Sequence, residues 1–381
     1  MNPLHELVQA IEADPGQTES IVEHCLKAHG SPLVHEGSAT FLLVGDYDEV
    51  ALVHWVFGLE SRIPFKRLDG TRVWRLSIEL PQRARIEYKL EVVHHGNRQW
   101  IKDPHNPHLA FDPFGANSVC RMDGYVEPGW VEPDPDARPG TLDGFSLDSK
   151  AFGDRRDIKL WLPREYKRHK TYPLLVVHDG DDYLKYTGLR TVLENLTHRH
   201  EIMPMVVALT SGVQRNEEYG ANPRHARFIV DDLLPALEAR HHLSADPRDR
   251  GIMGASFGGV ASLYTAWNHP GHFGKVFCQS GSFVFTDIGH HGRSELWDPV
   301  VQFVNRFRRD PARVDARLFL SCGVFESLIA YNRSLVPLLR DAGVPHRFRE
   351  SRDGHNWIGW RDRLRDGLTW LFPGHLWMTY D

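Results

Sequence analysis

Apolar and polar residues follow two different rhythms along the 381-residue chain. Residues 37–127 contain short apolar runs that are rich in β-branched and aromatic side chains, at 39–44, 50–55, 73–80 and 86–93. Residues 73–80 alternate apolar and polar positions with a period of two, which is typical of a strand with one buried face. Because glycine-containing turns separate the runs, this part of the chain predicts a β-sandwich.

From residue 141 onward the rhythm changes. Short apolar runs have the length of buried strands, at 158–162, 174–177, 205–209, 251–253, 276–278 and 318–321. Helical stretches lie between several of them, and the stretch 225–240 places five apolar residues on one face: Phe228, Ile229, Leu233, Leu234 and Leu237. Strands that alternate with amphipathic helices predict an α/β domain whose mostly parallel sheet is covered on both faces.

Two further stretches lie outside these halves, one before the first half and one between the two. Residues 1–36 are typical of two short amphipathic helices separated by Pro15-Gly16, which we interpret as a packing appendage. Residues 128–140 contain four prolines, which favour an extended linker. Since the chain is longer than one hydrophobic core usually supports, we predict a helical segment 1–36, a β-domain 37–127, a linker 128–140 and a catalytic α/β domain 141–381.

Composition excludes several classes of function. The net charge of -5 gives no electrostatic basis for binding nucleic acid or an anionic membrane. None of the four cysteines forms a C-x-x-C pair, and the histidines are scattered, so we predict no metal site. The first residues lack the pattern of a signal peptide, and no apolar stretch is long enough to cross a bilayer. We therefore expect a cytoplasmic protein.

The strongest motif is the pentapeptide G-x-S-x-G formed by Gly254, Ser256 and Gly258. It follows an apolar pair and opens the apolar stretch 260–267, which predicts a strand, a sharp turn and a helix, as a nucleophile elbow requires. The two glycines would let the strand and the helix approach closely. A glycine-rich turn with an incidental serine is the alternative, but the flanking pattern favours a nucleophile.

A serine nucleophile needs a base, and the base needs an acid that orients it. In α/β-hydrolases these follow in the order serine, acid, histidine. His355 lies between a strand-like run, 346–350, and a final helical stretch, which makes it our candidate base, with His346 and His375 as weaker alternatives. Glu326 is the first carboxylate after the run 318–321 and is our candidate acid, whereas Asp353 is its rival.

Two backbone amides should hold the developing oxyanion. One is the amide of Phe257, directly after the nucleophile. For the second we predict Asp181, in the turn that follows the run 174–177. These steps need no metal and no organic cofactor, so the candidate enzyme is a serine esterase.

Together the motifs resemble the enterochelin (enterobactin) esterase family of esterase D-like α/β-hydrolases, over about residues 37–373. The resemblance rests on Leu174-Leu-Val-Val-His-Asp-Gly180, the elbow, Gln279-Ser-Gly-Ser282, Gly354-His-Asn-Trp357, Arg215-Asn-Glu-Glu218 with Asn222, and, in the β-domain, Leu68-Asp-Gly-Thr-Arg-Val-Trp74, Ile86-Glu-Tyr-Lys89 and Asp103-Pro-His-Asn-Pro107. It implies an immunoglobulin-like early-set β-sandwich before an α/β-hydrolase domain. It also implies hydrolysis of a catecholate siderophore of the enterobactin type inside the cell, with a ferric siderophore as a candidate substrate.

The same resemblance suggests residues that contact the substrate. Arg215 would line or brace the cleft, with a structural ion pair to Glu218 as the alternative. Tyr183, Phe283 and Trp357 are further candidates. The sequence Phe283-Val-Phe285 stands where siderophore esterases tend to carry tryptophan. Two alternatives therefore stay open: the same chemistry on another acyl ester, such as a feruloyl or acetyl carbohydrate ester or an acyl transfer, and a non-catalytic binding module with a hydrolase fold.

Overall fold

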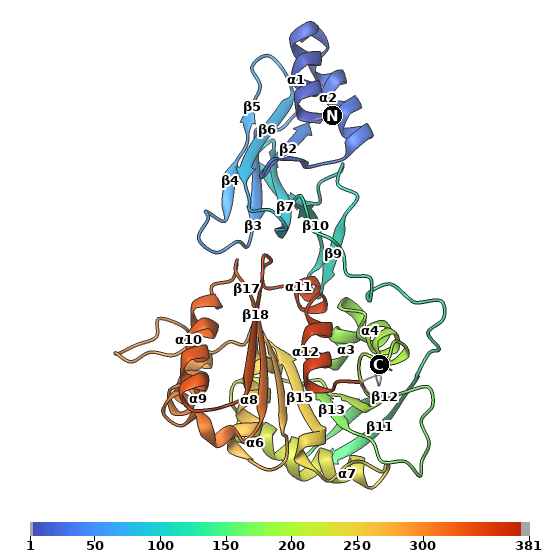
Figure 1. Cartoon of the computed structure of the whole chain (residues 1–381). Coiled ribbons are helices and arrows are strands. Elements are labelled where there is room, and N and C mark those ends of the chain that lie inside the picture. Colours follow the sequence, from blue (N-terminus) through green and yellow to red (C-terminus); the bar gives the residue numbers. More distant parts are fainter. Residues whose placement is uncertain (1–2, 375–381) are drawn as a thin grey trace. The chain divides into compact units, whose positions relative to one another are not determined.

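The computed structural model describes residues 3–374 and divides the chain into two compact units. Unit 1 contains the chain up to Glu127 together with two short later segments, Gly323–Ser327 and Ser351–Asn356. Unit 2 contains Pro128–Cys322, Leu328–Glu350 and the chain from Trp357 onward. Figure 1 shows the elements of both units in the colours of the sequence. The candidate base His375 lies outside the described residues.

Unit 1 is built on two antiparallel sheets. One sheet has the order β1 (Leu33–His35), β2 (Ser38–Val44), β6 (Val73–Glu79) and β5 (Lys66–Arg67). The other has the order β4 (Arg62–Pro64), β3 (Glu49–His54), β7 (Arg85–His94), β10 (Gly115–Arg121) and β9 (Leu109–Asp112), and β8 (Asn97–Ile101) pairs with β7. Apolar side chains of both sheets, among them Phe41, Leu52 and Leu90, form one core. The predicted β-sandwich is therefore confirmed.

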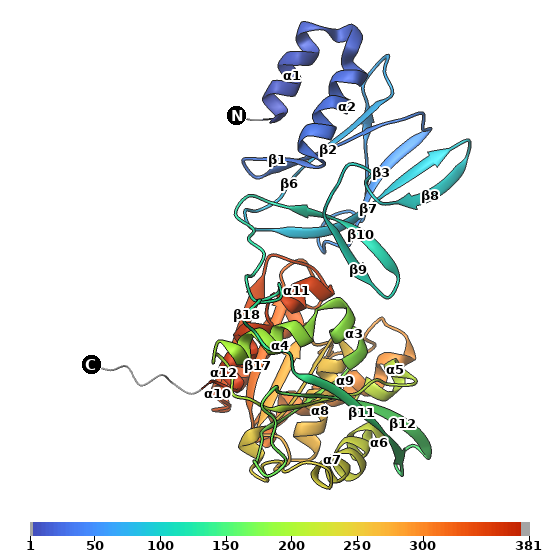
Figure 2. The ribbon, with the colours of Figure 1, turned by 90° about the vertical axis from the view of Figure 1, so that its right-hand side faces the viewer.

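The two predicted N-terminal helices are present as α1 (Pro3–Ala13) and α2 (Thr18–His29), joined by the 3₁₀ turn Pro15–Gln17. They lie beside the sheet of β1, β2 and β6 (Figure 2). Leu7, Val22 and Leu26 pack with Leu42 and Val73, which are on those strands. The helices thus bury apolar residues of the sandwich that water would otherwise reach, and they form part of unit 1.

Unit 2 is built on an eight-stranded sheet. Its order is β11 (Thr141–Ser149), β12 (Asp154–Leu162), β14 (Val206–Leu209), β13 (Leu174–Val177), β15 (Arg250–Ala255), β16 (Lys275–Gln279), β17 (Arg317–Gly323) and β18 (His346–Ser351). The strands from β14 to β17 pair in parallel, and β12 pairs with β14 antiparallel. Each run predicted after residue 141 lies within one of these strands, except that the run 205–209 begins one residue before β14.

Helices cover both faces of this sheet. One face packs against α6 (Pro223–Arg227), α7 (Leu234–Glu238), α8 (Phe257–Asn268), α9 (Asp298–Arg309) and α10 (Ile329–Asp341). The other packs against α3 (Gly180–Tyr186), α4 (Leu189–His198), α11 (Trp357–Arg361) and α12 (Leu364–Leu371). The short helix α5 (Arg215–Tyr219) and the 3₁₀ turns Pro247–Asp249, Glu295–Trp297 and Pro311–Val314 complete the unit.

The predicted helix 225–240 is continuous but contains one π-helical turn, Phe228–Leu233, between α6 and α7. All five residues of its predicted apolar face are buried. Among the described helices, none has both the length and the apolar character needed to span a membrane.

Candidate active site

Ser256 occupies the turn between β15 and α8 with φ 57° and ψ -120°. A non-glycine residue adopts a positive φ only at a cost in free energy, and such strain is concentrated at functional sites. The surrounding backbone holds the turn in place, since the Ser256 amide donates to the Gln279 carbonyl at 2.9 Å and the Ser282 amide donates to the Ser256 carbonyl at 3.2 Å. The sequence-predicted serine therefore sits on a strained strand-to-helix turn.

The Ser256 hydroxyl has a second hydroxyl beside it. Its Oγ lies 3.2 Å from the Oγ of Ser282, which is buried in the loop after β16. Ser280 in that loop also has a positive φ, 48°, and its Oγ accepts a hydrogen bond of 2.9 Å from the Trp360 indole. Sequence reasoning noted Ser282 only as part of a motif, although a polar residue at a strand's carboxyl end could have drawn attention to it.

The loop after β13 runs alongside the elbow. The His178 amide donates to the Met253 carbonyl at 2.9 Å. Asp179 is left-handed with φ 54°, and its amide donates to the Tyr219 hydroxyl, while the Gly180 amide donates to the Thr210 carbonyl. These two amides are therefore engaged within the protein.

Asp181 is the second residue of α3, and Phe257 is the first residue of α8. Amides in the first turn of a helix have no acceptor within that helix. The Asp181 side chain is exposed and pairs with Lys159, so the amide is the group of this residue that is suited to an oxyanion. The geometry is thus compatible with both predicted donors.

Arg215 braces this loop. Its Nε donates to Asp179 Oδ1 at 2.8 Å and its Nη2 to Oδ2 at 2.6 Å, which is a two-point ion pair. The alternative prediction of an ion pair with Glu218 is wrong, because Arg156 takes that carboxylate at 2.6 Å. A Cβ placed on Gly258 would lie 3.4 Å from Asp179 Oδ2, so the braced carboxylate lies against the first turn of α8.

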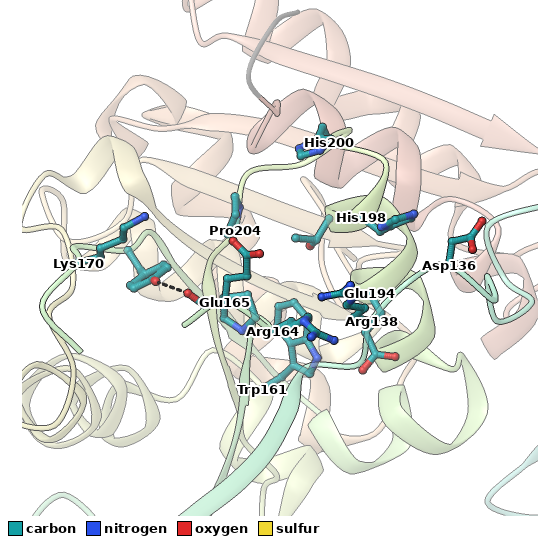
Figure 3. A pocket seen from close by; sticks show the side chains of 13 residues that line it. Asp136, Arg138, Trp161, Arg164, Glu165, Lys170, Glu194, His198, His200 and Pro204 are labelled. Atoms are coloured by element: carbon teal, nitrogen blue, oxygen red, sulfur yellow. Dashed lines mark hydrogen bonds between the residues drawn. The ribbon is translucent and has the colours of Figure 1, made fainter. Parts of the chain in front are cut away.

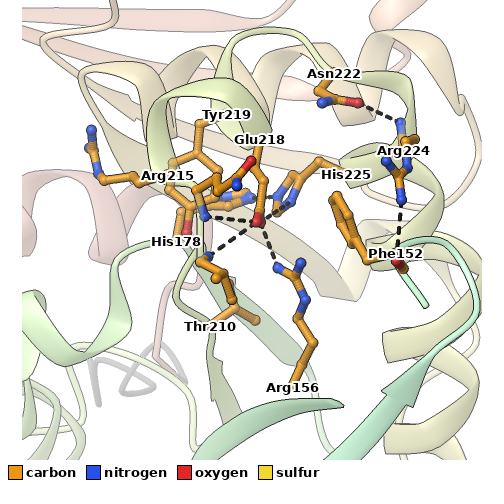
Figure 4. A network of polar contacts seen from close by, with 12 residues as sticks. Phe152, Arg156, His178, Thr210, Arg215, Glu218, Tyr219, Asn222, Arg224 and His225 are labelled. Atoms are coloured by element: carbon orange, nitrogen blue, oxygen red, sulfur yellow. Dashed lines mark hydrogen bonds and ion pairs between the residues drawn. The ribbon is translucent and has the colours of Figure 1, made fainter. Parts of the chain in front are cut away.

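A buried polar network supports Arg215 from behind (Figure 4). Glu218 accepts the amides of Val213 and Gln214 at 3.1 and 3.0 Å, which fixes the segment just before Arg215. In the same network the ring nitrogens of His178 and His225 lie 2.9 Å apart. Burial lowers the pKa of His178 to about 4 and that of His225 well below its ordinary value, so both buried rings are uncharged near neutral pH.

The predicted base and acid are hydrogen-bonded to each other within unit 1. His355 Nδ1 lies 2.7 Å from Glu326 Oε2, and Glu326 Oε1 accepts the Gly323 amide at 2.7 Å. The Glu326 residue is 3% exposed, whereas the His355 side chain is 36% exposed. A carboxylate at Nδ1 fixes the tautomer in which Nε2 of the neutral ring is the proton acceptor.

The rival carboxylate has other partners. Asp353 Oδ1 and Oδ2 each accept from Arg85 at 3.2 Å, and Oδ1 also accepts the Gly354 amide and the Asn356 side chain. Burial raises the pKa of Asp353 to about 6, although the charge of Arg85 opposes this. The alternative base His346 lies in β18 with its Nδ1 2.8 Å from the Val344 carbonyl.

Two predicted substrate contacts need correction. Tyr183 and Phe283 are both fully buried, so their side chains do not reach a substrate in this conformation. Tyr183 instead donates to the Gln279 side chain at 2.8 Å, next to the loop that pins Ser256. Trp357 is 8% exposed and packs edge-on against Tyr183, so its role is also mainly that of a support.

A cavity of about 500 Å³ lies elsewhere in unit 2 (Figure 3). Trp161, Tyr172 and Pro204, which line it, lie at the end of antiparallel β12 and just before β13 and β14. The cavity therefore opens at the amino ends of the parallel strands, opposite to the edge that carries Ser256. None of the predicted site residues lines it.

Comparison with known proteins gives a consistent result. The family model described as "Putative esterase" matches residues 149–371. The iron(III) enterobactin esterase of Dickeya dadantii is 29% identical over 359 residues, covering 81% of this chain and 79% of its own length. Its counterpart from Escherichia coli K12 is 29% identical over 335 residues, covering 81% of each chain.

A solved enterobactin esterase from Shigella flexneri, studied in the presence of enterobactin, aligns with a TM-score of 0.74 at 21% identity. The alignment covers 92% of this chain and 97% of that one. The predicted resemblance and the predicted α/β-hydrolase fold are therefore confirmed.

Proposed function

We propose that this chain, which belongs to the family described as "Putative esterase", is a carboxylic ester hydrolase. Its nucleophile would be Ser256, and its substrate would be a catecholate siderophore of the enterobactin type. The observation that carries the proposal is the backbone of Ser256, since its φ of 57° combined with a ψ of -120° lies outside the left-handed region that turn residues commonly adopt, and such strain is concentrated at functional sites. The 2.7 Å pair of His355 and Glu326 supports it, since this pair has the composition and tautomer of a general base.

In the proposed reaction, Ser256 Oγ attacks the ester carbonyl while His355 Nε2 takes its proton. Glu326 holds the ring and stabilises the imidazolium. The amides of Phe257 and Asp181 donate to the oxyanion. The intermediate collapses to an acyl-serine as His355 returns the proton to the leaving alcohol. Water, activated by the same ring, then releases the acid and restores Ser256.

Arg215 acts in this scheme through Asp179, as a brace for the loop that carries the second oxyanion donor. Its side chain is 35% exposed, so it can also face an anionic substrate such as a ferric catecholate. The siderophore itself is proposed because two relatives of 29% identity, matched over about four fifths of their length, are named iron(III) enterobactin esterases. Release of iron from the substrate would then take place in the cytoplasm.

The test is hydrolysis of enterobactin, with and without iron, beside feruloyl and acetyl sugar esters, followed by mass spectrometry. Wild type and Ser256→Ala are assayed together. We expect cleavage of the trilactone by wild type and none by the variant. Cleavage of the sugar esters alone would move the substrate to another acyl ester. Equal turnover by wild type and Ser256→Ala would overturn the assignment of the nucleophile.

A further inference from the structure

The β-sandwich of unit 1 holds the loop that carries His355. We propose that Arg85, on β7, is a positioning residue for the hydrolytic reaction, and that the N-terminal unit is thereby part of the catalytic machinery and not only a neighbour of it. The inference rests on the proposed function, because it takes His355 as the base.

Arg85 bonds to residues on both sides of His355. Its Nη1 donates to both carboxylate oxygens of Asp353 at 3.2 Å and to Asn356 Oδ1 at 3.1 Å. Its backbone amide donates to the Arg352 carbonyl at 2.9 Å. Three of the four residues nearest to the sequence Gly354-His355 are therefore tied to one arginine.

The arginine itself is rigidly held. It is 2% exposed, and its Nη2 donates to Glu87 Oε1 at 2.8 Å, two residues along the same strand. Glu87 in turn accepts from the Asn117 side chain on β10 at 2.9 Å. Although burial alone would lower the pKa of Arg85, Asp353 and Glu87 raise it, so the guanidinium is charged. A planar, charged fork that is fixed by the sheet can orient a loop at several points at once.

The acid loop is held by the same unit. The Phe57 amide, in the turn after β3, donates to the Phe325 carbonyl at 2.8 Å, directly before Glu326. Phe325 also packs against the sandwich core. The sandwich therefore contacts both loops that meet in the pair of His355 and Glu326, and it sets the distance between them.

This arrangement predicts a loss of catalysis that does not depend on substrate recognition. Lysine at position 85 keeps the charge but offers a compact ammonium, which cannot reach Glu87, Asp353 and Asn356 together. A base displaced by about 1 Å can lower the rate about 100-fold. With p-nitrophenyl acetate, a small ester that makes few binding contacts, we expect Arg85→Lys to lower kcat about 10-fold or more, with KM within about two-fold of wild type.

The matched control is Arg62→Lys. Arg62 also forms a two-carboxylate network in the same sheet, with Glu91 at 2.7 Å and Glu49 at 2.8 Å, and both of these partners lie on strands of the sheet and not in either loop. We expect its kinetics to match wild type. The rate at which a fluorophosphonate labels Ser256 is measured in parallel, because it depends on the base and should fall with kcat in Arg85→Lys alone.

If Arg85→Lys fails to fold, the triple variant Arg85→Gln, Glu87→Gln and Asp353→Asn replaces it, since it removes all three buried charges of the cluster together. A folded variant of either kind with wild-type kcat and labelling rate would overturn the proposal. A wild-type protein that neither cleaves esters nor is labelled at Ser256 would instead contradict the proposed function. The two failures are thus distinguishable.

Discussion

The geometry of the elbow predicts that alanine at Gly254 is far more damaging to stability and activity than alanine at Gly258. A Cβ added at Gly254 would lie 2.5 Å from the carbonyl carbon of Gly258 and 2.6 Å from its oxygen. Ordinary van der Waals contact begins at 3.4 Å, and the colliding atoms belong to the backbone of α8, which cannot turn aside as a side chain can. Gly254→Ala must therefore open the turn that carries Ser256.

The size of the losses in stability and in kcat follows from this geometry. Overpacking a close contact costs about 1–3 kcal/mol of unfolding free energy. The turn must open by close to 1 Å, and a displacement of about that size at a reacting group can lower kcat about 100-fold. At Gly258 the same addition meets only the His178 Cβ at 3.3 Å and Asp179 Oδ2 at 3.4 Å. Alanine also favours the helix there by about 1 kcal/mol, which offsets the tighter contact.

The assay compares Gly254→Ala with Gly258→Ala by urea unfolding and by hydrolysis of p-nitrophenyl acetate. We expect the first variant to lose stability and nearly all activity, and the second to stay within about 1 kcal/mol of wild type in stability. Equal behaviour of the two variants, or a Gly254→Ala protein with wild-type kcat, would refute the argument that close backbone approach shapes the elbow.

Other predictions test the remaining parts of the site. Glu326→Gln should lower kcat by about 10⁴-fold with the fold intact, because a carboxamide no longer fixes the tautomer of His355; steady-state kinetics and circular dichroism check this. Arg215→Lys should lower kcat more than it raises KM, since it loosens the two-point pair with Asp179; a rise in KM alone would indicate a role in substrate binding only. Folding raises the pKa of Asp353 from 3.8 to about 6, so the folded state binds that proton more tightly than the unfolded chain, and stability falls as the pH rises between these values. The unfolding free energy of wild type relative to Asp353→Asn should thus drop by about 2 kcal/mol between pH 4 and pH 7, as measured by urea denaturation; an unchanged difference would contradict it.

The parts of this molecule that could be predicted from sequence are those set by neighbouring residues. The elbow around Ser256 depends on a strand, two glycines and a helix that are adjacent in the chain, and its geometry has the expected form. The strands of both units could also be predicted, because each is marked by a run of apolar residues that are adjacent in the chain. The buried face of the helix from Phe228 to Leu237 can be predicted because apolar residues recur there with the period of a helix.

Partners that are distant in sequence could not be predicted. Arg215 pairs with Asp179, 36 positions away, whereas the nearer carboxylate of Glu218 pairs with Arg156. Asp353 pairs with Arg85, which is 268 positions away, and the residues around either one give no indication of this pairing. The sequence also predicts Tyr183 and Phe283 as substrate contacts, but their full burial depends on how the sheet and its helices pack.

The composition of unit 1 has a consequence for the order of events during synthesis. Its strands are translated within the first third of the chain, whereas the segments Gly323–Ser327 and Ser351–Asn356 emerge only near its end. Until then Arg85 has Glu87 as its ionic partner but lacks its hydrogen bonds to Asp353 and Asn356. The pair of His355 and Glu326 is assembled in the same late step. In the proposed mechanism, a nascent chain therefore contains the nucleophile Ser256 long before the base His355, and we expect no ester hydrolysis until translation is almost finished.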